Sequence, residues 1–193
     1  MFNSENQGID FLIENAHKAI PYSCVLLSDK TKGKVIVSGG FDSRLLFTSV
    51  KDAKVYKEIN LQETLAQVSG ILKINMTQPF VYTLTRKRDG TRWLAGLETG
   101  NVLEFKGVSK NKPAKCIEGH TTRVVRTEYF EPRPELVLSV SDDLSWALWD
   151  SNTTDLIKKV AINAKPNWVE STGCGRVVVS DVEGYLNFYD LKE

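Results

Sequence analysis

The sequence has 193 residues, of which 41% are hydrophobic and 25% are charged, and its formal net charge is +1. This length is sufficient for one domain with a sizeable core. The near balance of acidic and basic residues excludes a global attraction to nucleic acid or to an anionic membrane surface. No apolar run reaches the roughly 18 positions of a membrane span, and the start lacks the regions of a secretory signal. We therefore expect an intracellular protein, cytoplasmic or nuclear, that does not contact a membrane.

The predicted elements follow one another in a regular order along the chain. The first is a lone apolar run at residues 9–13, and the one helix-like window, Leu61–Val68, predicts either a helical turn or an irregular insertion. The other elements show the period-two alternation of strands. In chain order these patterns are "SCVLL", "KVIVSGG" with "RLLFTS", "VYTLTRK", "RWLAG" with "NVLEFK", "RVVRTEYF", "ELVLSVS" with "LSWALWD", "LIKKVAIN", "NWVES", and "RVVVS" with "YLNFYD".

Four of these strand pairs repeat one spacing. Ten positions separate Ser38 from Thr48, Ala95 from Phe105, Ser139 from Trp149, and Val179 from Tyr189. The two runs of each pair are joined by a turn rich in Asp, Asn, Ser and Gly, several of which tolerate the positive φ of a tight hairpin. A further strand precedes each hairpin, and "LIKKVAIN" follows the third. Four antiparallel strands per unit of about 45 residues are typical of a β-propeller blade.

The third unit resembles a WD repeat over its full length, because it carries "GH" at Gly119–His120 and "WD" at Trp149–Asp150. The other units resemble degenerate WD repeats that close with Thr48–Ser49, Phe105–Lys106 and Tyr189–Asp190. The order is also similar to the C-terminal half of a small group of WD-repeat proteins, whose corresponding places are taken here by "NAH", "EGHTTRV" and "KPNWV". The resemblance implies an all-β fold, a WD-repeat β-propeller with about four four-stranded antiparallel blades.

The whole of residues 1–193 is then one propeller region. Its blades are expected at roughly 14–60, 70–110, 115–162 and 165–193. Three arrangements remain open for such a set of blades. They can form the C-terminal half of a longer propeller, which we favour, or one half of a dimer with eight blades. They can also close into a ring of four blades, in which a strand at residues 9–13 completes the last blade.

The resemblance assigns a structural tetrad to the third unit, formed by His120, Ser139, Asp143 and Trp149. An imidazole, a hydroxyl, a carboxylate and an indole N–H can pair in series and leave no buried polar group without a partner. The rival interpretation is a Ser-His-Asp catalytic triad, but Ser139 lies in mid-strand and has no Gly-x-Ser-x-Gly elbow around it. We therefore expect no catalytic residues, and we expect the neighbouring carboxylate of Asp142 to face solvent.

The other units keep fragments of this tetrad. The first unit has His17, Ser38 and Asp42, the second has Thr77, Thr99 and Phe105, and the fourth has Glu183 and Tyr189. Aromatic packing is expected to hold these blades where the tetrad is incomplete.

Neither a metal site nor a cofactor site is expected. The three cysteines stand far apart and form no CxxC pattern, which predicts reduced, mostly buried thiols. His17 and His120 are too isolated in the sequence to ligate a metal. The segments "LETGN" and "STGCG" contain glycines but no phosphate-binding fingerprint.

The sequence favours a non-catalytic protein–protein interaction scaffold or substrate-receptor module. The expected partners are other proteins, including the members of a multiprotein complex. The alternative is a WD-repeat hydrolase or esterase, or a nucleic-acid-associated factor. Nucleic acid is the less favoured partner, because the one basic cluster, "RKRDGTR" at residues 86–92, spans an Asp-Gly turn and is typical of a solvated loop tip.

The partner surface is expected beside the third unit, on the face where the "GH" turn and the turn between its second and third strands open. The residues predicted there are Thr122, Arg123, Asp142 and Leu144, with Ser43 and Arg44 at the matching turn of the first unit. Arginine gives planar bidentate bonds and leucine gives area that is desolvated on binding, so the pair can form the centre of an interface.

Overall fold

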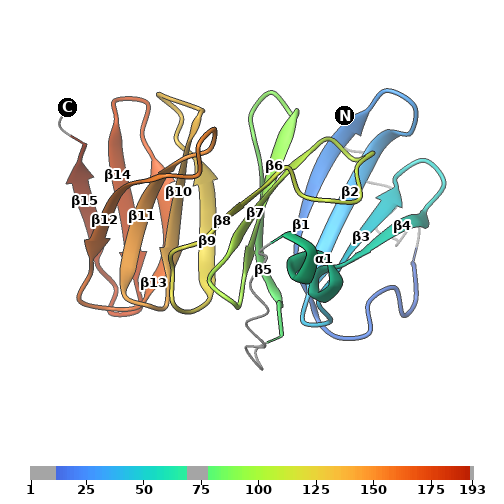
Figure 1. Cartoon of the computed structure of the whole chain (residues 1–193), viewed down its shortest axis with the longest axis horizontal. Helices are drawn as coiled ribbons and strands as arrows, with labels where there is room; N and C mark the ends of the chain where they lie inside the picture. Colours follow the sequence, from blue (N-terminus) through green and yellow to red (C-terminus); the bar gives the residue numbers. More distant parts are fainter. Residues whose placement is uncertain (1–11, 69–77, 192–193) are drawn as a thin grey trace, which may run out of the picture.

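The computed structural model describes residues 12–68 and 78–191, which form four antiparallel sheets and one short helix (Figure 1). The first sheet contains β1 (Pro21–Asp29), β2 (Gly33–Gly40), β3 (Arg44–Ser49) and β4 (Lys54–Asn60). The second contains β5 (Val81–Arg86), β6 (Arg92–Leu97), β7 (Val102–Lys106) and β8 (Lys115–Ile117). The third contains β9 (Val124–Tyr129), β10 (Leu136–Ser141), β11 (Ser145–Asp150) and β12 (Leu156–Ala161). The fourth contains β13 (Pro166–Ser171), β14 (Arg176–Asp181) and β15 (Leu186–Asp190).

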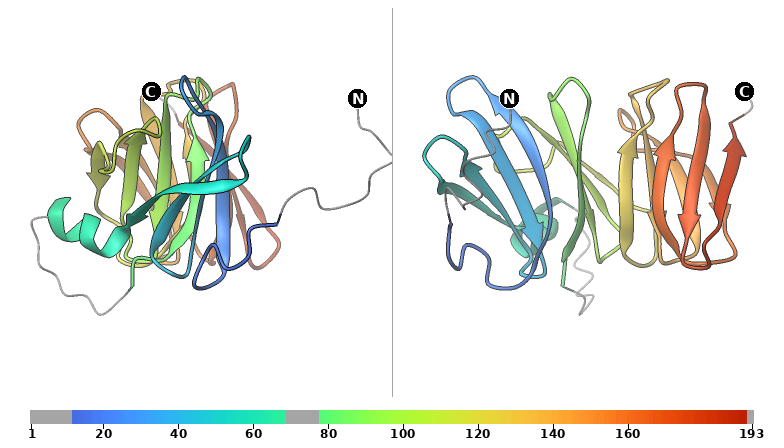
Figure 2. Two further views of the ribbon diagram at one scale, coloured as in Figure 1. Left: turned by 90° about the vertical axis from the view of Figure 1, so that its right-hand side faces the viewer. Right: turned by 180° about the vertical axis from the view of Figure 1, so that it is seen from behind.

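Each sheet is one blade, numbered here 1 to 4 in chain order, and neighbouring blades pack face to face in a row (Figures 1 and 2). The first strands of successive blades contact one another, so β1, β5, β9 and β13 form the inner edge of the row. Blades 1 and 4 lie at opposite ends of this row. The described residues therefore form an open arc and not a closed ring of four blades.

The turn between the second and third strand contains a residue with positive φ in all four blades. Its positive-φ residue is Ser43 (φ 58°) in blade 1, Gly100 (85°) in blade 2, Leu144 (59°) in blade 3 and Gly184 (89°) in blade 4. These residues occupy one position of the repeat, because each lies five positions after the residue that begins the ten-residue spacing of its blade. Ser43 and Leu144 lack the freedom of glycine there, so tertiary contacts hold them in the left-handed region.

Three apolar layers, one between each pair of adjacent blades, form the core. Blades 1 and 2 share a layer that contains Phe47, Trp93 and Phe105, in which the last two rings stack with centroids 4.2 Å apart. Blades 2 and 3 enclose a layer that contains Trp149, and blades 3 and 4 one that contains Trp146. Alternation of apolar residues along the strands produces these layers, because successive side chains point to opposite faces of a blade.

The structure refines several expectations. The helix-like window is a true helix, α1 (Leu61–Val68), which Asn60 caps by accepting the backbone N–H of Gln62 at 3.0 Å. Blade 4 has three strands in the described part of the chain. The expected strand at residues 9–13 lies mostly outside the described residues, and Leu12 and Ile13 are exposed and outside any strand.

The expectation of mostly buried thiols was wrong. All three cysteines are free, but Cys24 and Cys174 are exposed and Cys116 is half-buried. Cys24 lies on a blade face that no other described blade covers, and Cys174 lies in the turn between β13 and β14. Cysteine is usually buried because its side chain is apolar, but the positions of these two residues in the fold leave them exposed.

Candidate functional site

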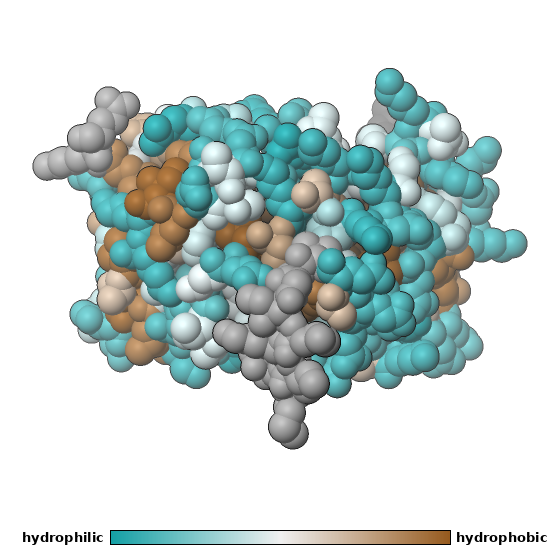
Figure 3. All heavy atoms as spheres, viewed as in Figure 1, coloured by the Kyte–Doolittle hydropathy of each residue, from teal (hydrophilic) through white to brown (hydrophobic). Residues whose placement is uncertain are grey.

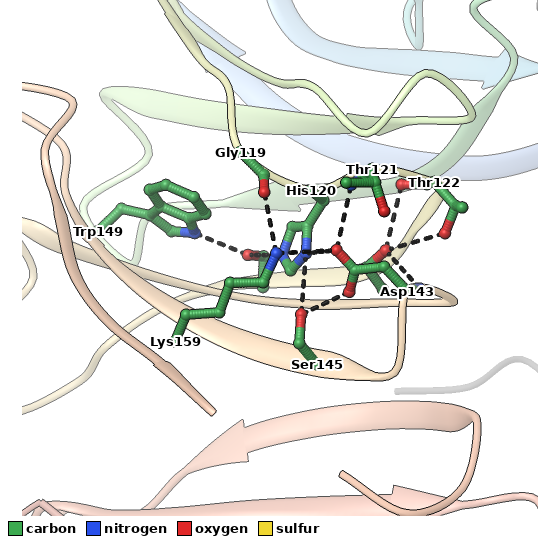
Figure 4. Close-up of polar contacts among 10 residues, drawn as sticks. Gly119, His120, Thr121, Thr122, Asp143, Ser145, Trp149 and Lys159 are labelled. Carbon is green, nitrogen blue, oxygen red and sulfur yellow. Dashed lines mark hydrogen bonds and ion pairs between the residues drawn. The ribbon is translucent and has the colours of Figure 1, made fainter. Parts of the chain in front are cut away.

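The four residues of the predicted tetrad meet in blade 3. Figure 4 labels three of them, His120, Asp143 and Trp149. His120 Nε2 and Ser139 Oγ are 2.8 Å apart, and the indole Nε1 of Trp149 donates to the same hydroxyl oxygen at 2.8 Å. The other ring nitrogen of His120, Nδ1, lies 3.0 Å from Asp143 Oδ2. The chain of contacts therefore joins the loop before β9, strand β10, the following turn and strand β11.

Residues that the sequence did not single out surround Asp143. Ser145 Oγ donates to its Oδ1, Thr121 N–H donates to its Oδ2 at 3.1 Å, and Lys159 Nζ donates to Oδ2 at 3.0 Å. Lys159 also donates to the carbonyl oxygen of Gly119 at 2.9 Å (Figure 4). Because Lys159 is on β12, this contact ties the outermost strand of blade 3 to the loop that carries His120.

The electrostatics of the tetrad favour a neutral imidazole beside an ionised carboxylate. Burial lowers the pKa of His120, although the hydrogen bond and charge of Asp143 act in the opposite direction. Burial alone disfavours the charged form of Asp143, but hydrogen bonds from Ser145, His120 and Lys159 outweigh it and hold the pKa of this carboxyl well below its usual range.

The tetrad has the residue types of a catalytic triad but not its accessibility. Ser139 is 0% exposed, and its oxygen already receives the Trp149 N–H. A nucleophile must reach a substrate carbonyl beside donors that stabilise the oxyanion. The buried hydroxyl in the middle of β10 cannot do this, so the arrangement is suited to fixing strands.

Blade 1 repeats the hydrogen bonds of the tetrad without the tryptophan. His17 Nε2 lies 2.8 Å from Ser38 Oγ, and His17 Nδ1 lies 3.0 Å from Asp42 Oδ2, while Thr48 occupies the tryptophan position.

Blades 2 and 4 are held differently. In blade 2 Thr99 donates to Asn101 at 2.7 Å, and Phe105 stacks on a neighbouring tryptophan. In blade 4 Tyr189 packs against Trp146 with ring centroids 5.2 Å apart, and Glu183 lies exposed in the turn. Thr77, the remaining residue predicted for blade 2, lies outside the described residues.

Arg123 is the centre of the predicted partner surface. Its Nε donates to Asp142 Oδ2 at 2.6 Å, and its Nη1 donates to the hydroxyl oxygen of Tyr82 in blade 2 at 3.1 Å. Its guanidinium carbon lies 4.9 Å from the centre of the Tyr82 ring. Thr122 is exposed beside it, and Leu144 is 40% exposed at the tip of the neighbouring turn. The structure thus brings four of the six predicted surface residues together, with the arginine already oriented.

The expectation that Asp142 faces solvent was wrong. Its side chain is 14% exposed and is paired with Arg123, and Lys165 of the loop before β13 lies 4.0 Å away. The reason is that two cations from adjacent elements converge on this turn. Asp142 therefore orients Arg123 and is not a free acceptor.

Ser43 and Arg44 are placed differently from the other four residues. Ser43 is 6% exposed, and its carbonyl oxygen accepts the N–H of Leu61 at the start of α1. The side chain of Arg44 is 13% exposed, because its guanidinium pairs with Asp42 and Glu58 and donates to the carbonyl of Ala16. Both residues stabilise blade 1 and the loop in front of it, which leaves little of either for a partner.

An aromatic cluster adjoins Arg123 that sequence reasoning missed. Tyr22 stacks on Phe41 with centroids 5.3 Å apart, Tyr82 lies 5.3 Å from Tyr22 and 5.2 Å from Phe41, and Phe80 lies 5.5 Å from Phe41. Tyr22 is 57% exposed. These rings come from the starts of β1 and β5 and from the β2–β3 turn, so they meet only when blades 1 and 2 pack. We call Thr122, Arg123, Asp142 and Leu144, together with Tyr22 and Tyr82, the Arg123 surface.

A hollow of about 320 Å³ lies at the other end of the inner strands. It is lined by Thr85, Arg86, Arg88, Arg126, Glu128, Tyr129, Glu131 and Glu170. Within it Arg88 pairs with Glu131, and the guanidinium carbon of Arg126 lies 3.7 Å from the centre of the Trp168 ring. Burial raises the pKa of Glu128 to about 7. The hollow therefore carries mixed charge on its walls.

Among residues 12–68 and 78–191, no group of three or more His, Cys, Asp and Glu side chains is placed to hold a metal ion. The same residues include no helix of the length and apolarity needed to cross a bilayer.

Comparison with solved structures identifies the fold. The chain superposes on the crystal structure of the WD40 beta propeller domain of Doa1 with a TM-score of 0.72, over 92% of this chain and 53% of that chain, at 13% sequence identity. The chain has the WD40 β-propeller fold. No protein-family model matches the sequence. Among curated proteins, it is 26% identical over 162 residues to the pre-mRNA-splicing factor cwf17 of Schizosaccharomyces pombe.

The chain spans about half of each of these proteins, since the matches cover 43% of cwf17 and 53% of the Doa1 chain. The fold predicted from the WD-like repeat is confirmed. Within this fold, the tetrad lies on the side of blade 3 that faces blade 2. The Arg123 surface lies on the face of the propeller where the β2–β3 and β10–β11 turns are located.

Proposed function

We propose that this chain is a non-catalytic protein-interaction module, a scaffold or substrate receptor, that binds its partner through the Arg123 surface. The main support for this proposal is the position of the Arg123 guanidinium. It is fixed by Asp142 and Tyr82 before any partner arrives, so its ordering entropy is already lost in the free protein. Beside it lie the exposed Leu144 and Tyr22. Arginine and tyrosine flanked by apolar area are the residue types that dominate binding at protein interfaces.

The WD40 fold supports this class of function, because a propeller holds loops rigidly on two faces of packed sheets. The similarity to a pre-mRNA-splicing factor supports a place in a multiprotein complex and a nuclear location. Fold and similarity are analogies, so the identity of the partner rests on experiment.

Two other functions have less support. A hydrolase would need an accessible nucleophile, and Ser139 is 0% exposed. Nucleic-acid binding would rest on the basic hairpin at residues 86–92. There Arg88 pairs with Glu131, Arg92 pairs with Glu104, and Lys87 lies 3.9 Å from Asp89, so acidic neighbours compensate much of its charge.

The test is affinity capture from cell extract with the wild-type chain and with a double variant, Arg123→Ala with Leu144→Ala. Proteins recovered by the wild type are then purified and their dissociation constants measured. We expect the double variant to bind at least tenfold more weakly, which corresponds to about 1.4 kcal/mol. Its melting temperature should stay within a few degrees of the wild type, because both side chains are at the surface.

A matched control is Arg133→Ala with Leu156→Ala. Arg133 is exposed in the β9–β10 loop, and Leu156 is 49% exposed at the start of β12, both at the opposite end of blade 3. This control should bind as the wild type does. Equal affinity of wild type and surface variant would overturn the proposal, and loss of binding only on neutralising residues 86–92 would move the site to the basic hairpin.

A further inference from the structure

Charge is distributed unevenly between the two ends of the strands. The Arg123 surface lies at the end where the inner strands begin. The opposite end of blades 1 and 2 carries the β1–β2 turn, the β3–β4 loop, the β5–β6 turn and the last residue of β7. These segments, residues 29–34, 49–54, 86–92 and 106, contain ten lysines and arginines and three aspartates, so their net charge is +7. Because the formal net charge of the whole chain is +1, the rest of the chain has a net charge of −6.

The positive charge is confined to blades 1 and 2. The matching segments of blades 3 and 4, residues 130–135, 150–155 and 171–176, contain two basic and four acidic residues, a net charge of −2. All four blades share one strand arrangement, so the fold itself does not require this charge. It is a property of the surface that blades 1 and 2 present together.

Most of these cations have no acidic partner. Lys87, Arg88 and Arg92 pair with carboxylates. Each aspartate of the segments accepts a hydrogen bond from a nearby serine or threonine, as Asp29 does from the hydroxyl of Thr31 at 2.7 Å. Seven other cations are exposed and form no ion pair within the part of the chain that the structure describes. We call these seven residues the basic end: Lys30, Lys32, Lys34, Lys51, Lys54, Arg86 and Lys106.

The packing of blades does not cover the basic end. Blades pack through the faces of their sheets, whereas the β1–β2 and β5–β6 turns project along the strands (Figure 1). Figure 3 shows mainly hydrophilic residues at the upper right, where Figure 1 places the β1–β2 turn and the β3–β4 loop. Packed sheets lie about 10 Å apart, which is about the Debye length at 0.1 M salt. The charges of blades 1 and 2 therefore act as one positive field.

We propose that the basic end is a second interaction surface, which binds an acidic segment of a protein partner. Opposite charge on the partner relieves the repulsion among the seven cations and steers the two molecules together. Six of the seven are lysines, whose ammonium groups are point charges on flexible stems. A run of aspartate and glutamate side chains can satisfy such cations without a fixed geometry.

Two features of these segments favour carboxylates over nucleic acid. Arginine makes planar, bidentate contacts to phosphate, but two of the three arginines here, Arg88 and Arg92, already pair with Glu131 and Glu104. The segments also contain no aromatic residue on which an unpaired base could stack. The surface therefore has the charge that attracts a polyanion but lacks the groups that recognise nucleotides.

Binding of a fluorescent oligoglutamate peptide to the 193-residue chain tests the proposal, with anisotropy measured over a salt series. We expect binding at about 0.05 M salt that weakens as salt is added, because exposed charges are screened. Two variants address the two blades, Lys30→Gln with Lys51→Gln in blade 1 and Arg86→Gln with Lys106→Gln in blade 2. Each should raise the dissociation constant roughly fivefold, because each removes two surface ion pairs with the peptide.

The matched control is Lys110→Gln with Lys112→Gln. It removes the same charge from the β7–β8 loop, where Lys112 lines a different hollow beside α1. This control should bind oligoglutamate as the wild type does. The melting temperature of all three variants should not fall, because the substituted side chains are exposed and form no ion pairs within the described ranges.

Three results would overturn the proposal. The first is no binding of oligoglutamate at low salt, and the second is an equal loss in the control, which would mean that net charge alone governs binding. The third is tighter binding of an oligouridylate of equal charge, which would assign the basic end to nucleic acid. The double variant Arg123→Ala with Leu144→Ala should bind oligoglutamate as the wild type does, so the basic end and the Arg123 surface succeed or fail separately.

Discussion

Trp149 and Ser139, ten residues apart, are joined by an indole-to-hydroxyl hydrogen bond of 2.8 Å that crosses from β11 to β10. The same hydroxyl lies 2.8 Å from His120 Nε2, so one oxygen links two strands of blade 3 and the loop before β9. All three side chains are buried. When a buried polar group loses its hydrogen-bond partner, the free energy of unfolding falls by roughly 1–3 kcal/mol. We expect each bond of the tetrad to contribute to stability on this scale.

The first prediction concerns the indole N–H alone. Trp149→Phe keeps an aromatic ring in the layer between blades 2 and 3 but removes the donor to Ser139. We expect a loss of about 1 kcal/mol in the free energy of unfolding, seen as a melting temperature lower by about 2–4 °C. Trp168→Phe is the matched control, because Trp168 is 46% exposed and its indole bonds to an exposed glutamate. A larger loss in the control than in Trp149→Phe would contradict a structural role for the tetrad bond.

The second prediction concerns the imidazole and the carboxylate. His120→Ala or Asp143→Ala should destabilise the fold by about 1–3 kcal/mol, because each leaves buried or ion-paired partners unsatisfied, Lys159 among them. Thermal or urea unfolding of each variant measures the loss. Binding through the Arg123 surface should persist well below the melting temperature. Full stability together with loss of an enzymatic activity would instead favour the catalytic interpretation.

The third prediction concerns acid. Burial lowers the pKa of His120 in the folded state, so the unfolded chain takes up its proton first, near the ordinary value of 6.5. The stability that comes from this group is present above that pH and is lost as the pH falls below it. Asp143, whose pKa is also lowered, adds a further loss below its ordinary value of 3.8. Urea unfolding at pH 7.5 and pH 5.5 should therefore show a smaller pH dependence in His120→Gln than in the wild type. An equal dependence in both proteins would mean that His120 titrates as it does in the unfolded chain.

How far the sequence predicts this structure depends on whether a feature lies within one blade. The tetrad was predictable, because the resemblance to a WD repeat implies it and all its members lie in one blade. Within the hairpin, Ser139 and Trp149 are diagonal neighbours, since Ser139 pairs with Ala147 and Trp149 pairs with Val137. The aromatic cluster was not predictable, since Tyr22 and Tyr82 are 60 positions apart and meet only through the packing of two blades.

The exposure of the side chains at the turns could also not be predicted from the sequence. Ser43 and Leu144 occupy the same repeat position and have nearly the same φ, yet one is 6% exposed and the other 40%. Both carbonyl oxygens accept a backbone N–H at 2.9 Å, from Leu61 in blade 1 and from Ile162 in blade 3, so the backbone bond is not the cause of the difference. The side chains differ, because the hydroxyl of Ser43 donates to Gln78 Oε1 at 3.5 Å, whereas Leu144 has an apolar side chain.

The fourth prediction concerns Glu128, whose carboxyl lies in the hollow near the ends of β5, β9 and β13. Ser171 donates two hydrogen bonds to Oε1, but Oε2 is buried and has no hydrogen-bond partner among the described residues. Burial raises the pKa of this carboxyl from 4.5 to about 7, so the folded state prefers the protonated form. Its contribution therefore becomes less favourable as the pH rises from 4.5 through 7, because the unfolded chain releases the proton first.

Glu128→Gln removes this charge and keeps an oxygen for Ser171. The variant should be more stable than the wild type by roughly 1–3 kcal/mol at pH 8, and the difference should vanish near pH 4.5, where the wild-type carboxyl is protonated in the folded state. Urea unfolding of both proteins across this range measures it. Glu131→Gln is the matched control, because Glu131 lines the same hollow but is exposed and paired with Arg88. A gain in the control as large as in Glu128→Gln would assign the effect to the net charge of the hollow and not to the buried carboxyl.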